Sequence, residues 1–140
     1  MKEEVKKMWL EDLRSGKYRQ GIGQLRESPT EGSGQPVAPQ VDKFCCLGLL
    51  ALRYALEHGE EFNKEWDARP YLPEEVVEWA GLHSDNPVMP FREDSYRDLI
   101  DPGAVWRVRD CGGPTLSLLN DADVPFPAIA DLIEENIVGE

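Results

Sequence analysis

Basic residues are few in this sequence relative to acidic ones. Its 140 residues include 15 lysines and arginines against 27 aspartates and glutamates, so the formal net charge is -12 at pH 7. Most of such a surface would repel a phosphate backbone. The composition therefore argues against general nucleic-acid binding.

Long hydrophobic runs are also missing. No apolar stretch approaches the ~20 residues of a membrane span. The charged N-terminal residues 1–7 lead into an amphipathic stretch and not into the apolar core of a signal peptide. We therefore expect a cytoplasmic protein that is neither exported nor inserted in a membrane.

Cysteine is rare as well. The three cysteines are odd in number and two are adjacent (Cys45, Cys46 and Cys111), which is unlike a disulfide scaffold and fits a reducing compartment. Adjacent cysteines lack the two-residue separation of a zinc knuckle, and the histidines, His58 and His83, stand apart from them. The sequence predicts no metal or cofactor site.

The length and the share of hydrophobic residues, 41%, suit one domain with its own core. Apolar residues at helical spacing predict helices, over 2–15, 43–57, 72–80, 95–100, 115–119 and from 127 to about 137. One segment, 104–109, alternates as a strand does, and its partner would come from 18–26 or 86–92. We predict a single compact α+β domain over 1–140, mostly helical, with a small two- or three-stranded sheet.

Several positions carry local structural signals. Residues 28–41 are rich in Pro, Gly, Ser and Gln, which is typical of a flexible loop. Gly48 interrupts a helix, so the sequence predicts a close approach to its backbone or an irregular first turn. Asn120 and Asp121 have the chemistry of a cap or tight turn between two helices. The four tryptophans are expected in the core or a cleft wall.

The most informative segment is 14–26, which holds four basic residues and no acidic one. Its three glycines would let backbone N–H groups approach oxygen atoms, and arginine offers a planar fork of donors. No named phosphate-binding fingerprint is present. The segment is thus either a site for a small anion or a solvated basic connector.

The anion hypothesis assigns a role to each candidate residue. Phosphate groups would be held by Lys17, Arg19 and Arg26, joined by Arg107 and Arg109 if the predicted strand faces the same cleft. The base or sugar of a nucleotide-derived ligand would contact Tyr18, Gln20 or Trp106.

A different class of function uses the adjacent cysteines. A thiol at a helix N-terminus is activated by the helix dipole, and Gln20, the two histidines and Asn120 occur in the order of a papain-like hydrolase. The run around Cys45 and Cys46 is apolar, however, and cysteine is among the most buried residues. Core packing is the favoured interpretation.

The chain also resembles a group of small uncharacterised proteins encoded by tailed bacteriophages and prophages. The sequence motifs that carry the resemblance are spread over most of the chain, at Leu13–Gly21, Phe44–Gly48, Leu72–Leu82, Leu118–Asp121 and Ile129–Glu134. It implies a bacterial cytoplasm during infection, and a counter-defence role by association with phage accessory proteins in general. Beside shorter members of the group, residues 28–41 look like an insertion.

The preferred hypothesis is therefore a non-enzymatic, phage-type accessory protein that binds or sequesters a small anionic, nucleotide-derived ligand. One alternative is a cysteine-dependent hydrolase or transferase. Another is an acidic inhibitor that occupies a basic surface of a host protein.

Overall fold

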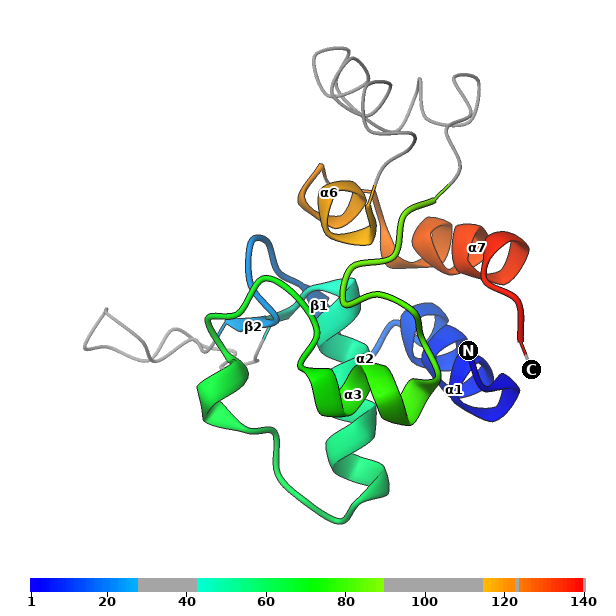
Figure 1. Ribbon diagram of the computed structural model, residues 1–140. Coiled ribbons are helices and arrows are strands. Elements are labelled where there is room, and N and C mark those ends of the chain that lie inside the picture. The colour runs from blue at the N-terminus through cyan, green and yellow to red at the C-terminus, as the bar shows by residue number, and fades with distance from the viewer. Residues whose placement is uncertain (28–42, 90–114, 123, 140) are drawn as a thin grey trace.

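The computed structural model describes residues 1–27, 43–89, 115–122 and 124–139. A small sheet lies at one side of the helices, next to α2 (Figure 1). The elements along the chain are α1 (Glu3–Arg14), β1 (Arg19–Gln20), β2 (Arg26–Glu27), β3 (Lys43–Phe44), α2 (Cys46–Glu57), the 3-10 helix η1 (Lys64–Trp66), α3 (Glu74–Ala80), α6 (Leu116–Asp121) and α7 (Phe126–Asn136). The predicted α+β fold, mostly helical with a three-stranded sheet, is confirmed.

Helices α1 and α7 pack against each other and bring the two ends of the chain together (Figure 1). Helix α1 buries Val5, Trp9 and Leu13, which recur at the three-to-four residue spacing of one helix face. Helix α7 buries Ile129 and Ile133 in the same way. Both amphipathic helices lie where the sequence predicts them.

Helix α2 is the central element of the core and contacts α1, α3 and α6. Residues 46–51 are all buried, which is expected of a helix covered on several sides. The indole N–H of Trp9 donates a 2.9 Å hydrogen bond to the carbonyl of Cys46. This bond ties α1 to the first turn of α2.

The start of α2 differs from the sequence prediction. The sequence predicts a helix over 43–57, whereas Lys43 and Phe44 form β3 and the helix begins at Cys46. The backbone of β3 pairs with two strands at once, and this pairing takes the place of a first helical turn. Cys45 becomes the N-cap, with its sulfur 3.3 Å from the N–H of Gly48.

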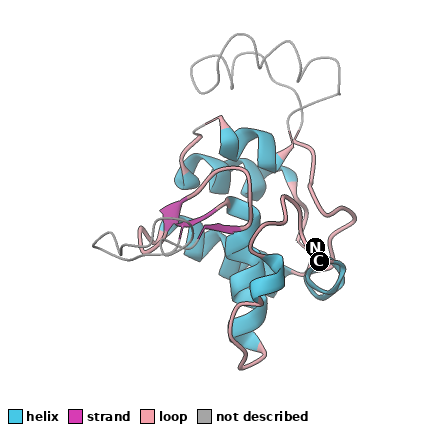
Figure 2. Cartoon of the chain, turned by 90° about the vertical axis from the view of Figure 1, so that its left-hand side faces the viewer, coloured by secondary structure: helices cyan, strands magenta, loops and turns pink. Residues whose placement is uncertain are grey.

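The sheet, magenta in Figure 2, has the strand order β1-β3-β2, with β3 parallel to β1 and antiparallel to β2. Residues 18–26 contribute to it, but their partner is β3, and the predicted pairing with 104–109 falls outside the described residues. The register pairs Arg19 and Glu27 with Lys43, and Gln20 and Arg26 with Phe44. The predictions of a loop over 28–41, a helix over 95–100 and a strand over 104–109 fall outside the described residues.

Glycine is required at position 48 because the backbone just before β2 lies against it. A Cβ atom at this position would collide with the backbone carbonyl of Leu25, which also accepts a hydrogen bond from the N–H of Cys45 at 3.2 Å. Leu25 itself is fully buried. The predicted close approach to the Gly48 backbone is confirmed, and the approaching group belongs to the basic segment.

The shorter helices end and begin close to their predicted residues. Gly81 terminates α3 in a left-handed conformation, with φ 71°. Thr115 caps α6 by accepting a 3.2 Å hydrogen bond from the N–H of Leu118. Helix α7 begins at Phe126, one residue before the predicted start. No helix within the described ranges combines the length and the apolar character needed to cross a lipid bilayer.

Candidate functional site

The basic segment 14–26 leaves α1, forms β1, turns, and returns as β2. Its turn is stabilised by the protein's own carboxylates. The N–H of Gly23, a residue with φ 80°, donates to Asp121 at 2.9 Å, and the N–H of Ile22 donates to Glu27 at 3.3 Å. The backbone donors expected to hold a ligand therefore bind Asp121 and Glu27, so any ligand must be held by side chains.

Arg26 is part of the folded framework. Its guanidinium makes a bidentate ion pair with Asp67, at 2.8 and 3.0 Å, and lies 4.6 Å from the centre of the Phe62 ring. Both charged side chains are largely buried. Because the fork is already occupied, a phosphate would have to displace Asp67, so we remove Arg26 from the set of ligand contacts.

Gln20 also turns inward. Its side-chain N–H₂ donates to the Asn120 amide oxygen at 3.0 Å and to the Val124 carbonyl at 2.8 Å. Asn120 is fully buried and in turn accepts from the N–H of Cys46 at 3.0 Å and donates to the Gly21 carbonyl at 2.7 Å. Asn120 thus joins the basic segment to the N-terminus of α2.

Tyr18 is half-buried, with its ring edge-on to Phe44 at a centroid distance of 6.0 Å. Phe44 continues this contact to Phe62, and Phe62 to Trp66. Tyr18 is therefore the first member of a chain of packed aromatic rings.

Two predicted contacts, Lys17 and Arg19, keep exposed side chains, and the structure adds a third cation that the sequence analysis missed. Lys43 is exposed on the neighbouring strand, in register with Arg19. Residues in register on adjacent strands project from the same face, about 5 Å apart. Within the described ranges, no ion pair involves Lys17, Arg19 or Lys43.

We call these three residues, Lys17, Arg19 and Lys43, the basic edge. Glu27 limits the basic edge on one side. It pairs with Lys43 from β2, whereas Arg19 pairs with Lys43 from β1. The sequence analysis missed Lys43 because it assigned residues 43–57 to a helix. The only strand signal in the sequence was charged Lys43 followed by apolar Phe44, and two residues are too few to be recognised as a strand.

Both described thiols are buried. Burial raises the pKa of Cys45 to about 11, and it raises the pKa of Cys46 well above its ordinary value of 9.0. The Cys46 thiol lies 3.5 Å from the carbonyl of Leu116. A buried thiol with a raised pKa is a poor nucleophile at neutral pH, so the predicted core packing of Cys45 and Cys46 is confirmed.

The histidines are not arranged to activate these thiols. His58 caps the C-terminal end of α2, whereas Cys45 caps the N-terminal end, and the 12-residue helix between them is about 18 Å long. His83 belongs to a pocket elsewhere. In the described residues no three His, Cys, Asp or Glu side chains gather as metal ligands do.

Three predicted contacts, Trp106, Arg107 and Arg109, lie outside the described residues.

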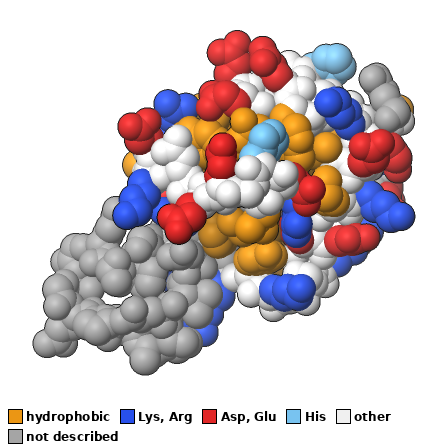
Figure 3. All heavy atoms as spheres, turned by 90° about the horizontal axis from the view of Figure 1, so that it is seen from below, with side chains coloured by type: hydrophobic (Ala, Val, Ile, Leu, Met, Phe, Trp, Pro, Cys, Tyr) orange, Lys and Arg blue, Asp and Glu red, His pale blue; other side chains and the backbone are white. Residues whose placement is uncertain are grey.

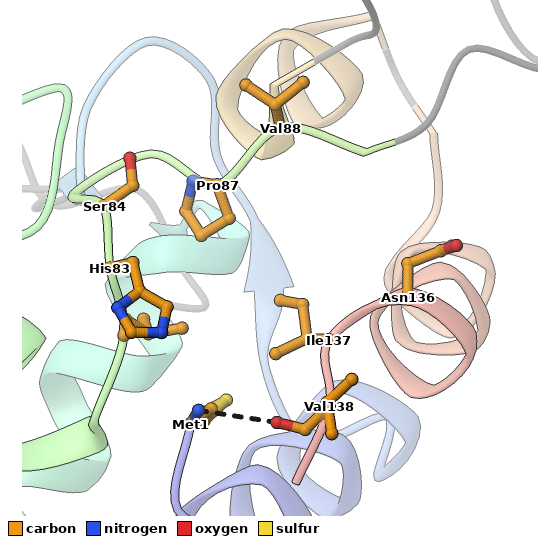
Figure 4. A pocket seen from close by; sticks show the side chains of 9 residues that line it. Met1, His83, Ser84, Pro87, Val88, Asn136, Ile137 and Val138 are labelled. Carbon is orange, nitrogen blue, oxygen red and sulfur yellow. Dashed lines mark hydrogen bonds between the residues drawn. The ribbon is translucent and has the colours of Figure 1, made fainter.

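A pocket that the sequence did not indicate lies between the segment after α3 and the end of α7 (Figure 4). Its volume is about 370 Å³, within the range of small-molecule sites. The lining is mostly apolar, with His83, Ser84 and Asn136 as its polar members. Val88 and Val138, both in the lining, are 53% and 76% exposed.

Comparison with protein families adds one finding. Residues 1–137 match the model of a family described as Domain of unknown function (DUF8296). The chain belongs to this family. No curated protein and no solved structure matches the chain. The DUF8296 description assigns no reaction or ligand.

Proposed function

We propose that the protein binds a small phosphate-bearing anion, of the nucleotide class, at the basic edge. One observation carries the proposal. Arg19 and Lys43 lie side by side on adjacent strands, exposed and without an ion-pair partner among the described residues, in a chain of net charge -12.

The chemistry of the three side chains suits this ligand class. An arginine fork binds two phosphate oxygens at once, and the lysines add point charges that follow a flexible phosphate chain. The acidic remainder of the surface repels long polyanions, which favours a compact ligand over a nucleic acid. Because the edge is open to solvent, binding should weaken as salt rises.

We propose that the ligand is a nucleotide signal of bacterial defence, and the resemblance to phage proteins supports this identity. Sequestration needs binding but no nucleophile, so it is compatible with the burial of Cys45 and Cys46. Cyclic dinucleotides and ADP-ribose derivatives therefore belong among the ligands to be tested.

The test is calorimetric titration with nucleotides, cyclic dinucleotides and ADP-ribose derivatives at two salt concentrations. Arg19→Ala or Lys43→Ala should each weaken binding about tenfold, because each removes a charge-assisted hydrogen bond of roughly 1.5 kcal/mol. Arg19→Lys should restore part of the loss, since a point charge cannot reproduce the fork. Glu27→Gln should strengthen binding about twofold by removing the bounding negative charge.

Lys7→Ala is the matched control, because Lys7 is an exposed lysine of α1 and its removal changes the net charge equally. It should leave the affinity within about twofold. The proposal fails if the wild type gives no heat with any of these anions. It also fails if Lys7→Ala weakens binding as much as Lys43→Ala does.

A further inference from the structure

A second surface lies at the C-terminal ends of α2 and α3. The ring of Tyr54, on α2, contacts the ring of His58, the C-cap residue one turn later, at a centroid distance of 4.1 Å and with the planes tilted by 32°. Trp79 of α3 meets Tyr54 edge-on at 5.5 Å and His58 at 6.1 Å. We call Tyr54, His58 and Trp79 the aromatic face.

This face reaches the surface of the molecule. His58 is exposed, and Tyr54 and Trp79 are each partly exposed. Figure 3 looks onto this end of the molecule and shows hydrophobic side chains around a histidine, with charged side chains at the margin. Tyrosine and tryptophan are enriched at the centres of protein interfaces because they bury a large area at low entropic cost.

The surrounding charge is negative. Residues 54–82 contain eight acidic and two basic residues. Five exposed glutamates flank the aromatic face along the chain, Glu57, Glu60, Glu61, Glu75 and Glu78. Of these, Glu57 lies 3.4 Å from Arg53, while no described side chain forms an ion pair with the other four.

From this combination we infer that the aromatic face is a docking site for an arginine-bearing segment of a partner protein. A guanidinium can stack on the exposed parts of the indole and phenol rings while its N–H groups bind Glu75 or Glu78. Lysine fits less well, because its ammonium group cannot stack as a plane or form a fork. The chain itself shows the same pairing, with Arg26 over Phe62 and bound to Asp67.

The inference is independent of the basic edge, since it uses other residues and the opposite charge. Its test uses hexa-arginine and hexa-lysine peptides as probes and the amide spectrum of ¹⁵N-labelled protein as the readout. Hexa-arginine should perturb amides of residues 54–61 and 74–82 and should bind several-fold more tightly than hexa-lysine. Perturbations confined to other residues, or equal binding of the two peptides, would overturn the inference.

Matched charge variants separate docking from general attraction to an acidic protein. Glu75→Gln with Glu78→Gln removes two charges beside the aromatic face, and Glu4→Gln with Glu11→Gln removes two exposed charges from α1. The first pair should weaken hexa-arginine binding about five- to tenfold and the second about twofold or less. Equal losses would overturn the docking site.

A ring variant tests the stacking. Trp79→Leu keeps an apolar side chain and removes the indole face, so the preference for arginine over lysine should disappear. Trp79→Phe keeps a ring and should retain part of the preference, which also serves if the leucine variant does not fold. An unchanged preference in both folded variants would contradict the arginine-stacking model.

Discussion

At the residue scale, the adjacent cysteines show how position separates two uses of one side chain. Cys45 caps α2 with its sulfur, and Cys46 points into the core against α6. Neither use requires a thiolate, and burial opposes its formation. The thiols therefore stabilise the fold in their neutral form.

This assignment predicts a loss of stability in alkaline solution. The ordinary thiol pKa is 9.0, and that of Cys45 in the folded protein is about 11. Thiols of the unfolded chain lose their protons first as pH rises, so the stabilisation is complete below pH 9 and is lost through pH 11. The two pKa values limit the Cys45 contribution to about 3 kcal/mol.

Urea denaturation at pH 8 to 11, on wild type and Cys45→Ser, measures this contribution. Serine keeps the capping acceptor and does not titrate in this range. The free energy of unfolding should fall more steeply with pH in the wild type than in the variant. Parallel curves would show that the Cys45 thiol has the same pKa in both states.

At the element scale, the contact between the basic segment and α2 depends on Gly48. Alanine normally stabilises a helix interior by up to about 1 kcal/mol relative to glycine. At this position the added methyl group would meet the Leu25 carbonyl, which is fixed by its hydrogen bond to Cys45. Strand end and helix would have to move apart.

We therefore expect Gly48→Ala to lower the free energy of unfolding by about 1–3 kcal/mol, as overpacked core substitutions do. Chemical denaturation measures the loss. An increase in stability, the usual result for an unhindered helical glycine, would mean that the strand end moves without cost.

At the scale of the whole molecule, charge is the dominant feature. The described ion pairs use Arg14, Arg26 and Arg53, and each is bound to acidic partners. With a net charge of -12, most of the remaining carboxylates repel one another. The aromatic face lies in the acidic region 54–82, whereas Arg19 and Lys43 of the basic edge lie on the sheet.

Salt should therefore stabilise the protein. Raising NaCl from about 10 to 300 mM shortens the Debye length from roughly 30 Å to under 8 Å and screens the repulsion. We expect the Tm to rise by several degrees, and to rise less in Glu75→Gln with Glu78→Gln. A falling Tm, measured by calorimetry, would indicate that the ion pairs outweigh the repulsion.

The sequence alone determined the features that depend on local periodicity and local steric limits. The buried faces of α1 and α7, the end of α3 at Gly81 and the need for space at Gly48 could all be predicted. Each of these features depends on residues three or four positions apart, or on the backbone conformations that a single residue can adopt. The burial of Cys45 followed from its apolar neighbours.

The tertiary structure decided which basic residues remain available to a ligand. Arg26 forms an ion pair with Asp67, forty-one residues away, and the N–H of Gly23 donates a hydrogen bond to Asp121. Lys43 joins Arg19 only through the register of β1 and β3. The sequence immediately around a residue does not specify partners so distant in the chain. They are selected when long-range strand pairing and burial of the core bring the elements together.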